Sequence, residues 1–272
     1  MTVAAVSSPG AEAQVGTNAN LPGTGMSMST DHFYWFNGTG PVPSVTKILS
    51  IVDKGYGLLA WGKRTVADTA ITYAEHLPQI IDAIGPSEAA RWLASLPDQE
   101  KGAAAKRGTD LHRYADMAAR GVQIDSKGLA LPPEYIPYLD AFSGYLARYG
   151  ASSIVSSEKA IWSDDGYAGT YDLLQLIDNE LWLIDIKTSK GIYPEFRLQL
   201  AGYGFADAII LPDDPNRYPM PEIKRYGILH LRPDLYTDTG YRLVEQVVGE
   251  REYVAFLAAK NLYDWREVAG KK

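Results

Sequence analysis

The chain has 272 residues, a formal net charge of −7 and no cysteine. The lack of cysteine excludes disulfide scaffolds, thiolate zinc sites, cysteine nucleophiles and cysteine-ligated iron–sulfur clusters. The acidic charge disfavours general nucleic-acid binding, so a DNA partner would need a local basic patch or metal ions. The sequence has neither a long apolar run nor a secretory signal pattern, so we expect a cytoplasmic protein without a membrane span.

The N-terminal segment differs in character from the rest of the chain. Residues 1–30 hold one charge, four glycines and no aromatic residue. Such a segment cannot bury enough surface to fix its own conformation, which predicts a flexible arm. Order is expected to begin with an aromatic strand at His32–Phe36, and residues 31–272 are expected to form a single domain.

Residues 31–150 are predicted to be mostly helical. Ser44 can cap a helix that begins at Val45. Further helical patterns cover residues 58–74, 78–96, 98–120 and 133–149. Breaks between them are expected at Gly57, Pro78, Gly85-Pro86 and Pro97.

Residues 151–272 are predicted to contain a sheet. Strands are expected at 154–163, 169–177, 181–188, 223–231 and 241–248. Helices are expected at 195–210 and 250–265. A helical part followed by a sheet with one inserted helix predicts an α+β fold, or a mixed α/β sheet.

The second and third of these strands are predicted to form a hairpin in which two carboxylates meet. With Asp178-Asn179 as a two-residue turn, Asp172 faces Asp185 directly, and Lys187 shares their sheet face. Opposed carboxylates with Cβ atoms about 5 Å apart repel each other, so the pair needs a positive partner. A divalent cation that prefers oxygen ligands, such as magnesium, manganese or calcium, would fit. The alternative is that Lys187 alone bridges the two acids at a solvated strand end.

Four short motifs occur in a fixed order along the chain. They are Gly108-Thr109-Asp110-Leu111-His112, Gly169-Thr170-Tyr171-Asp172, Asp185-Ile186-Lys187-Thr188 and Gln199-Leu200-Ala201-Gly202-Tyr203. The ordered set resembles the PD-(D/E)XK nuclease superfamily, specifically its RecB-like and phage exonuclease branch. The resemblance covers residues 40–250.

This resemblance implies a restriction-endonuclease-like core, a central mixed sheet flanked by helices, that cleaves phosphodiester bonds with one or two magnesium or manganese ions. It implies that Asp172, Asp185 and His112 bind the ion together with the backbone carbonyl of Ile186. Lys187 would orient or help deprotonate the attacking water and offset phosphoryl charge. The bound ion would lower the pKa of that water. An iron–sulfur cluster is excluded for lack of cysteine.

Four further residues have open roles. Glu158, in the strand before the hairpin, either borders the site or is an edge-strand charge. Gln199 and Tyr203 lie one helical turn apart and either contact the DNA backbone, which we favour, or lock their helix against the strand ends. Asp116 lies four residues after His112, where related nucleases often carry glutamate, and its role is undecided.

We therefore expect a phage-type, metal-dependent DNA exonuclease that acts in recombination or replication in the host cytoplasm. Between residues 101 and 120, five basic side chains against two acidic ones supply a local basic patch for DNA. The expected substrates are single strands or duplex ends, and a homo-oligomer or a recombination or replication protein is the expected further partner. One alternative is an endonuclease or structure-specific nuclease of the same fold. The other is a non-catalytic DNA-binding or assembly module with a relict nuclease fold.

Overall fold

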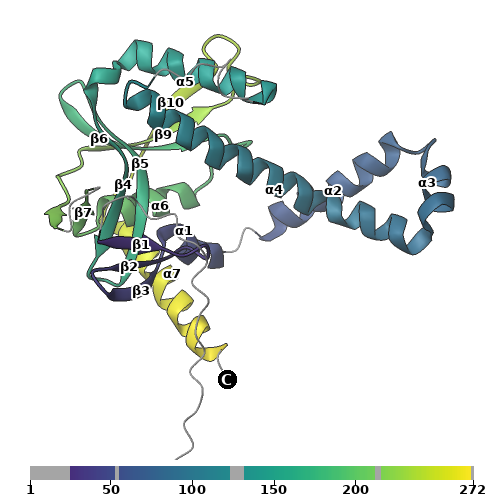
Figure 1. The fold of residues 1–272 in the computed structure, drawn as a ribbon, viewed down its shortest axis with the longest axis horizontal. Coiled ribbons are helices and arrows are strands. Elements are labelled where there is room, and N and C mark those ends of the chain that lie inside the picture. The colour runs from purple at the N-terminus through teal and green to yellow at the C-terminus, as the bar shows by residue number, and fades with distance from the viewer. Residues whose placement is uncertain (1–24, 53–54, 123–131, 212–215, 271–272) are drawn as a thin grey trace, which may run out of the picture.

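The computed structural model describes residues 25–52, 55–122, 132–211 and 216–270, which form a mixed α+β fold. Two sheets and several packed helices make the body, and a helical arm projects from it (Figure 1). The smaller sheet is antiparallel and consists of β1 (Met26–Met28), β2 (Phe33–Phe36) and β3 (Thr39–Pro43). The predicted α+β class is thus confirmed.

The larger sheet has seven strands in the order β10-β9-β6-β5-β4-β7-β8. These are β4 (Ile154–Ser163), β5 (Tyr167–Ile177), β6 (Glu180–Lys187), β7 (Ala208–Ile210), β8 (Arg217–Pro219), β9 (Arg225–Leu231) and β10 (Tyr241–Gln246). Strands β6 and β9 pair in parallel, whereas the other neighbours pair antiparallel. A parallel pair requires a crossover connection, and this one contains α6 (Glu195–Gly204).

The β5–β6 hairpin has the predicted register. Asp178 and Asn179 both adopt positive φ angles, 52° and 63°, as a type I′ turn requires. Ile177 pairs with Glu180, and the ladder continues outward to the pair Leu173 and Ile184. The next step along both strands places Asp172 opposite Asp185. The predicted register is confirmed over the five pairs of this ladder.

Both faces of the large sheet are covered. On one face, Leu174 and Leu183 pack in a cluster with α1 (Val45–Ile48), η1 (Leu49–Ile51), α6 and α7 (Glu250–Ala269). On the other face, Leu173 and Ile184 pack with α5 (Ile136–Tyr149) and the C-terminal part of α4 (Pro86–Ala119). The short 3-10 helices η2 (Pro133–Tyr135) and η3 (Ala151–Ser153) flank α5. Asp172 and Asp185 belong to the face that carries α6.

The projecting arm consists of α2 (Gly55–Thr72), α3 (Leu77–Ile84) and the N-terminal half of α4 (Figure 1). The predicted break at Pro97 is wrong, because α4 continues through this residue for 34 residues in all. Proline removes one helical hydrogen bond, but here its ring packs against α2. Gly62 marks the contact, because a Cβ there would lie 3.7 Å from Cβ of Pro97, an ordinary van der Waals distance. No helix in the described ranges is long and apolar enough to cross a membrane.

Three other predicted boundaries are wrong. The break expected at Gly57 lies inside α2, which begins at Gly55. The expected arm extends too far, because Met26–Met28 already forms β1 and Met26 is buried; residues 1–24 lie outside the described residues. The helix expected at 195–210 ends at Gly204, after which β7 joins the edge of β4. Asp207 fixes this change of direction by accepting hydrogen bonds from the Ser163 hydroxyl at 2.9 Å and the Asp164 amide at 2.8 Å.

A substitution at Gly202 would test how closely α6 must pack against its neighbours. A Cβ there would lie 3.0 Å from the Phe256 ring and 3.1 Å from Val45. We expect Gly202→Ala to lower the free energy of unfolding, because overpacking costs about 1–3 kcal/mol and outweighs the gain in helix propensity of about 1 kcal/mol. Gly102→Ala, at a position on α4 with open space around it, should raise the unfolding free energy. Chemical denaturation measures both, and equal stability of the two variants would contradict this packing.

Candidate metal centre

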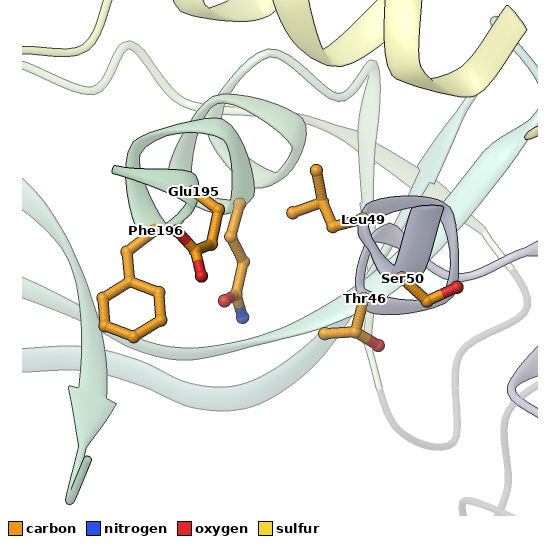
Figure 2. A pocket seen from close by; sticks show the side chains of 6 residues that line it. Thr46, Leu49, Ser50, Glu195 and Phe196 are labelled. Carbon is orange, nitrogen blue, oxygen red and sulfur yellow. The ribbon is translucent and has the colours of Figure 1, made fainter. Parts of the chain in front are cut away.

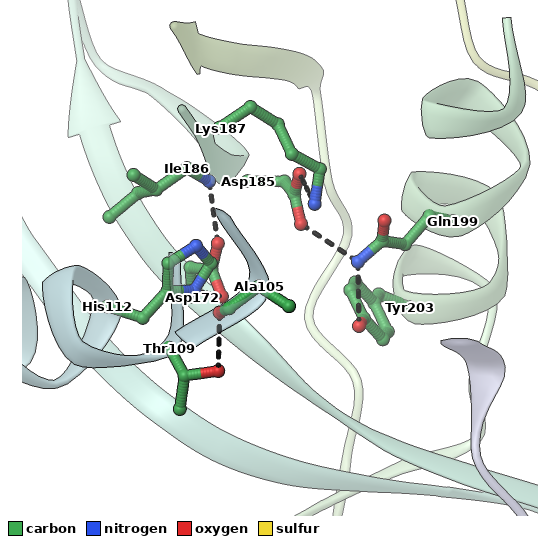
Figure 3. Close-up of polar contacts among 9 residues, drawn as sticks. All are labelled: Ala105, Thr109, His112, Asp172, Asp185, Ile186, Lys187, Gln199 and Tyr203. Atoms are coloured by element: carbon green, nitrogen blue, oxygen red, sulfur yellow. Dashed lines mark hydrogen bonds and ion pairs between the residues drawn. The ribbon is translucent and has the colours of Figure 1, made fainter. Parts of the chain in front are cut away.

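The candidate site lies where the β5–β6 hairpin meets helices α4 and α6 (Figure 3). Asp172 on β5 and Asp185 on β6 are almost completely buried, with side chains only 9% and 2% exposed. Buried carboxylates require hydrogen bonds or positive partners, because burial of an unpaired charge is costly. The surrounding elements supply these partners.

Asp172 is held from two directions. Its Oδ2 accepts a hydrogen bond from the backbone amide of Ile186 at 2.6 Å, and its Oδ1 lies 3.1 Å from Nδ1 of His112. The resemblance implied Ile186 as a ligand through its carbonyl. The structure shows it contacting the site through its amide, and the role of the carbonyl stays a prediction.

His112 reaches the hairpin from α4, and Asp116 helps to fix that helix. The Asp116 carboxylate accepts a hydrogen bond from the Ser157 hydroxyl at 2.6 Å and pairs with Arg120. It therefore ties α4 to β4, one turn beyond His112, and has a positioning role. Thr109 donates to the carbonyl of Ala105 within the helix, at 3.2 Å, so its hydroxyl faces its own backbone (Figure 3).

Glu158 belongs to the site. Ligand atoms of His112, Glu158 and Asp172 all lie within 4.8 Å of one another. Glu158 adopts φ 47°, a left-handed conformation that is unfavourable for residues other than glycine and is often found at functional sites. The β4–β5 ladder explains its place, because Ser157 pairs with Leu173 and Lys159 with Tyr171, so that Glu158 stands opposite Asp172. Extending the hairpin register to a third strand would have found it from sequence.

Asp185 is held by Lys187 and Gln199. Its Oδ2 lies 2.6 Å from Nζ of Lys187, and its Oδ1 accepts a hydrogen bond from Nε2 of Gln199 at 3.0 Å. The same amide nitrogen donates to the Tyr203 hydroxyl at 3.0 Å. Gln199 and Tyr203 are both buried. These contacts favour the second of their two expected roles, the locking of α6 against the strand ends.

The glycine that opens the Gly169–Asp172 motif makes room for this network. A Cβ at Gly169 would lie 2.8 Å from Cε1 of Tyr203 and 3.3 Å from Val45. Only a residue without a side chain therefore lets Tyr203 lie against β5. Gly108, by contrast, has space at its Cβ, with Thr188 at 4.0 Å as its nearest neighbour. The structure gives no steric reason for glycine at position 108.

The proton affinities of the cluster are strongly shifted. Burial lowers the pKa of His112, but the charge and hydrogen bond of Asp172 outweigh this and raise it to about 9. Burial raises the pKa of Glu158 to about 8, and the charge of Asp172 adds to the rise. Burial also raises the pKa of Asp185 to about 6, although Lys187 opposes it. Burial would raise the pKa of Asp172, but the charge and hydrogen bond of protonated His112 hold this pKa below its usual value.

The donor set fits a divalent cation. Carboxylate oxygens with one imidazole suit magnesium or manganese, and the described residues bring His112, Glu158 and Asp172 into one group. Asp185 lies outside that group, but its Oδ2 is buried and makes no well-aligned hydrogen bond, although Lys187 is close. A cation beside these carboxylates would balance their charge and satisfy that oxygen.

No protein-family model matches this chain, and no curated protein matches it either.

The pKa values predict how ion binding depends on pH. Coordination requires deprotonated His112 and Glu158, and at neutral pH their pKa values of about 9 and 8 keep both largely protonated. We expect Mn²⁺ affinity to rise between pH 6 and pH 9, with release of protons on binding. Calorimetry in two buffers of different ionisation enthalpy measures both quantities.

Two histidine variants, one inside the cluster and one outside it, test whether the ion binds at this cluster. His112→Ala should weaken Mn²⁺ binding at least tenfold and reduce its pH dependence, since a ligand is lost. His76→Ala, at an exposed position on the arm, should bind like the wild type. Binding of Mn²⁺ that is equally tight in all three proteins would show that the ion does not occupy this cluster.

Proposed function

We propose that this protein is a metal-dependent DNA exonuclease of the RecB-like, phage type. The observation that carries the proposal is the convergence of His112, Glu158 and Asp172 beside the Asp185–Lys187 pair. Carboxylates and an imidazole that could hold a divalent ion, next to a lysine, suit hydrolysis of a phosphodiester bond, since negative charge develops on the phosphoryl oxygens. The order of the four sequence motifs supports the same conclusion.

Each residue has a defined part in the proposed reaction. His112, Glu158, Asp172 and Asp185 would hold a magnesium or manganese ion, which when bound lowers the pKa of a water and polarises the phosphate. Lys187 is 17% exposed at the strand end, and its ammonium lies 5.0 Å from the centre of the Phe196 ring. From there it would orient the attacking water and offset charge on the phosphoryl group.

The fold supports the expected restriction-endonuclease-like core. A hairpin carries the two aspartates, α6 follows it, and β9 returns parallel to β6. Both faces are covered by helices, so the strand ends at Asp185 and Lys187 are the natural place for a site. In open sheets with parallel strands, ligands bind outside the carboxyl ends of the strands.

The basic patch on α4 is weaker than its composition suggests. Lys106 pairs with Asp110 at 2.6 Å and Arg120 pairs with Asp116, so two of the five basic charges are offset locally. Beyond the end of β6, the ammonium of Lys190 lies 6.0 Å from the centre of the Trp61 ring. Trp61 belongs to the first half of α2. DNA would approach the ion between α4 and this loop, with Arg113 and Lys190 as cationic contacts. Binding should therefore depend on divalent ions as much as on basic side chains.

The deciding assay is degradation of end-labelled linear DNA with Mg²⁺ or Mn²⁺. We expect the wild type to release short products from the ends, and Asp185→Ala and Lys187→Ala to lose at least 100-fold in rate, as expected for groups that act on the reacting atoms. Asp264→Ala and Lys260→Ala remove an equivalent ion pair on α7 and should leave the rate unchanged. Equal rates in all five proteins would refute the nuclease assignment.

A covalently closed circle separates the two nuclease types. An exonuclease leaves the circle intact while it degrades the linear form, whereas an endonuclease of the same fold cuts both. A protein that binds DNA but cleaves neither form, and shows no heat of Mn²⁺ binding, would instead be a non-catalytic module.

A further inference from the structure

A cavity of about 190 Å³ lies next to the candidate metal centre, between the α1–η1 turn and the start of α6. Two segments that are far apart in sequence line it: Thr46, Leu49 and Ser50 on one side, and Glu195, Phe196 and Gln199 on the other. Figure 2 shows side chains from both segments facing the same space.

The cavity and the metal centre share residues. Gln199 lines the cavity and donates its side-chain amide to Asp185 at 3.0 Å. Phe196 lines it too, and its ring lies under the ammonium of Lys187, 5.0 Å from the ring centre. Figure 3 shows that His112 and Gln199 approach the aspartates from opposite sides. An occupant of the cavity would therefore lie next to the reacting phosphate, on the side away from His112.

The lining selects a neutral occupant with hydrogen-bonding groups. Thr46 and Ser50 offer hydroxyls, and Phe196 and Leu49 offer apolar surface. Gln199 offers its amide oxygen, since its amide nitrogen already donates to Asp185 and Tyr203. The lining holds no cationic side chain that would attract a phosphate group. A nucleobase with its sugar meets these conditions, because it is uncharged, has a flat apolar face and carries donors and acceptors at its edges.

The cavity of about 190 Å³ gives such a group a place beside the strand ends. A base whose edge meets these polar side chains cannot be paired with another base at the same time. We propose that this cavity binds a single unpaired nucleoside adjoining the scissile phosphate. The inference rests on the proposed nuclease function and narrows the expected substrates to DNA that is single-stranded, or frayed, at the position of cleavage.

An abasic residue tests the proposal directly. A labelled single strand with one abasic position is digested in Mn²⁺, and the cleavage rate is read at every bond on a sequencing gel. We expect the wild type to slow at least fivefold at one bond next to the abasic residue, because the cavity then has no base to hold. Thr46→Trp should fill the cavity, slow cleavage at all bonds and remove the difference between abasic and intact positions.

The controls separate this inference from the proposed function. Thr72→Trp places the same ring at an exposed helical threonine on the arm and should behave like the wild type. Ser50→Trp fills the cavity from the neighbouring turn and replaces Thr46→Trp if that variant does not fold. Both filled variants should keep the wild-type affinity for Mn²⁺. Cleavage at the same rate past the abasic residue overturns the nucleoside site and leaves the nuclease standing, whereas no cleavage by the wild type overturns both.

Discussion

The main constraint on this structure is the repulsion between Asp172 and Asp185 inside the protein. Two carboxylates about 5 Å apart repel each other by about 3 kcal/mol at an effective dielectric constant of about 20, and their burial adds a desolvation cost. The hairpin register forces this meeting, because the turn at Asp178 and Asn179 leaves no other alignment of the two strands. The elements around the hairpin can be understood as the means by which the fold tolerates it.

Three elements bring the compensating groups. Helix α4 brings His112, β6 brings Lys187 together with the amide of Ile186, and α6 brings Gln199. The groups come from distant parts of the chain, so the cluster exists only in the folded protein. Asp116 and Gly169 contribute indirectly, one by tying α4 to β4 and the other by admitting Tyr203. At neutral pH, protonated His112 and Lys187 balance the two ionised aspartates while Glu158 stays largely protonated. A divalent cation would therefore take the place of the protons on His112 and Glu158.

The sequence predicted the parts of the fold that depend on local signals. The hairpin register followed from the turn pair Asp178-Asn179 and from the alternation of side chains between the two faces of a strand. Both can be recognised over a few residues. Pro97 and the strand at Ala208–Ile210 could not be predicted in this way, since packing against Gly62 and bonds to Asp207 come from tertiary contacts. In the site, the hairpin alone predicted that one sheet face carries Asp172, Asp185 and Lys187. The role of Glu158 stayed undecided, because its position depends on a third strand. The burial of Gln199 could not be predicted, because it depends on how α6 packs.

The backbone at Glu158 has a consequence for the stability of this protein. Its left-handed conformation would suit glycine, and its carboxyl group is partly buried among other acids. On grounds of folding alone, glycine would be the better residue at this position, both for the chain direction and for the charge. Glutamate at this position therefore costs folding stability, and service in the proposed metal site is the role that would offset this cost.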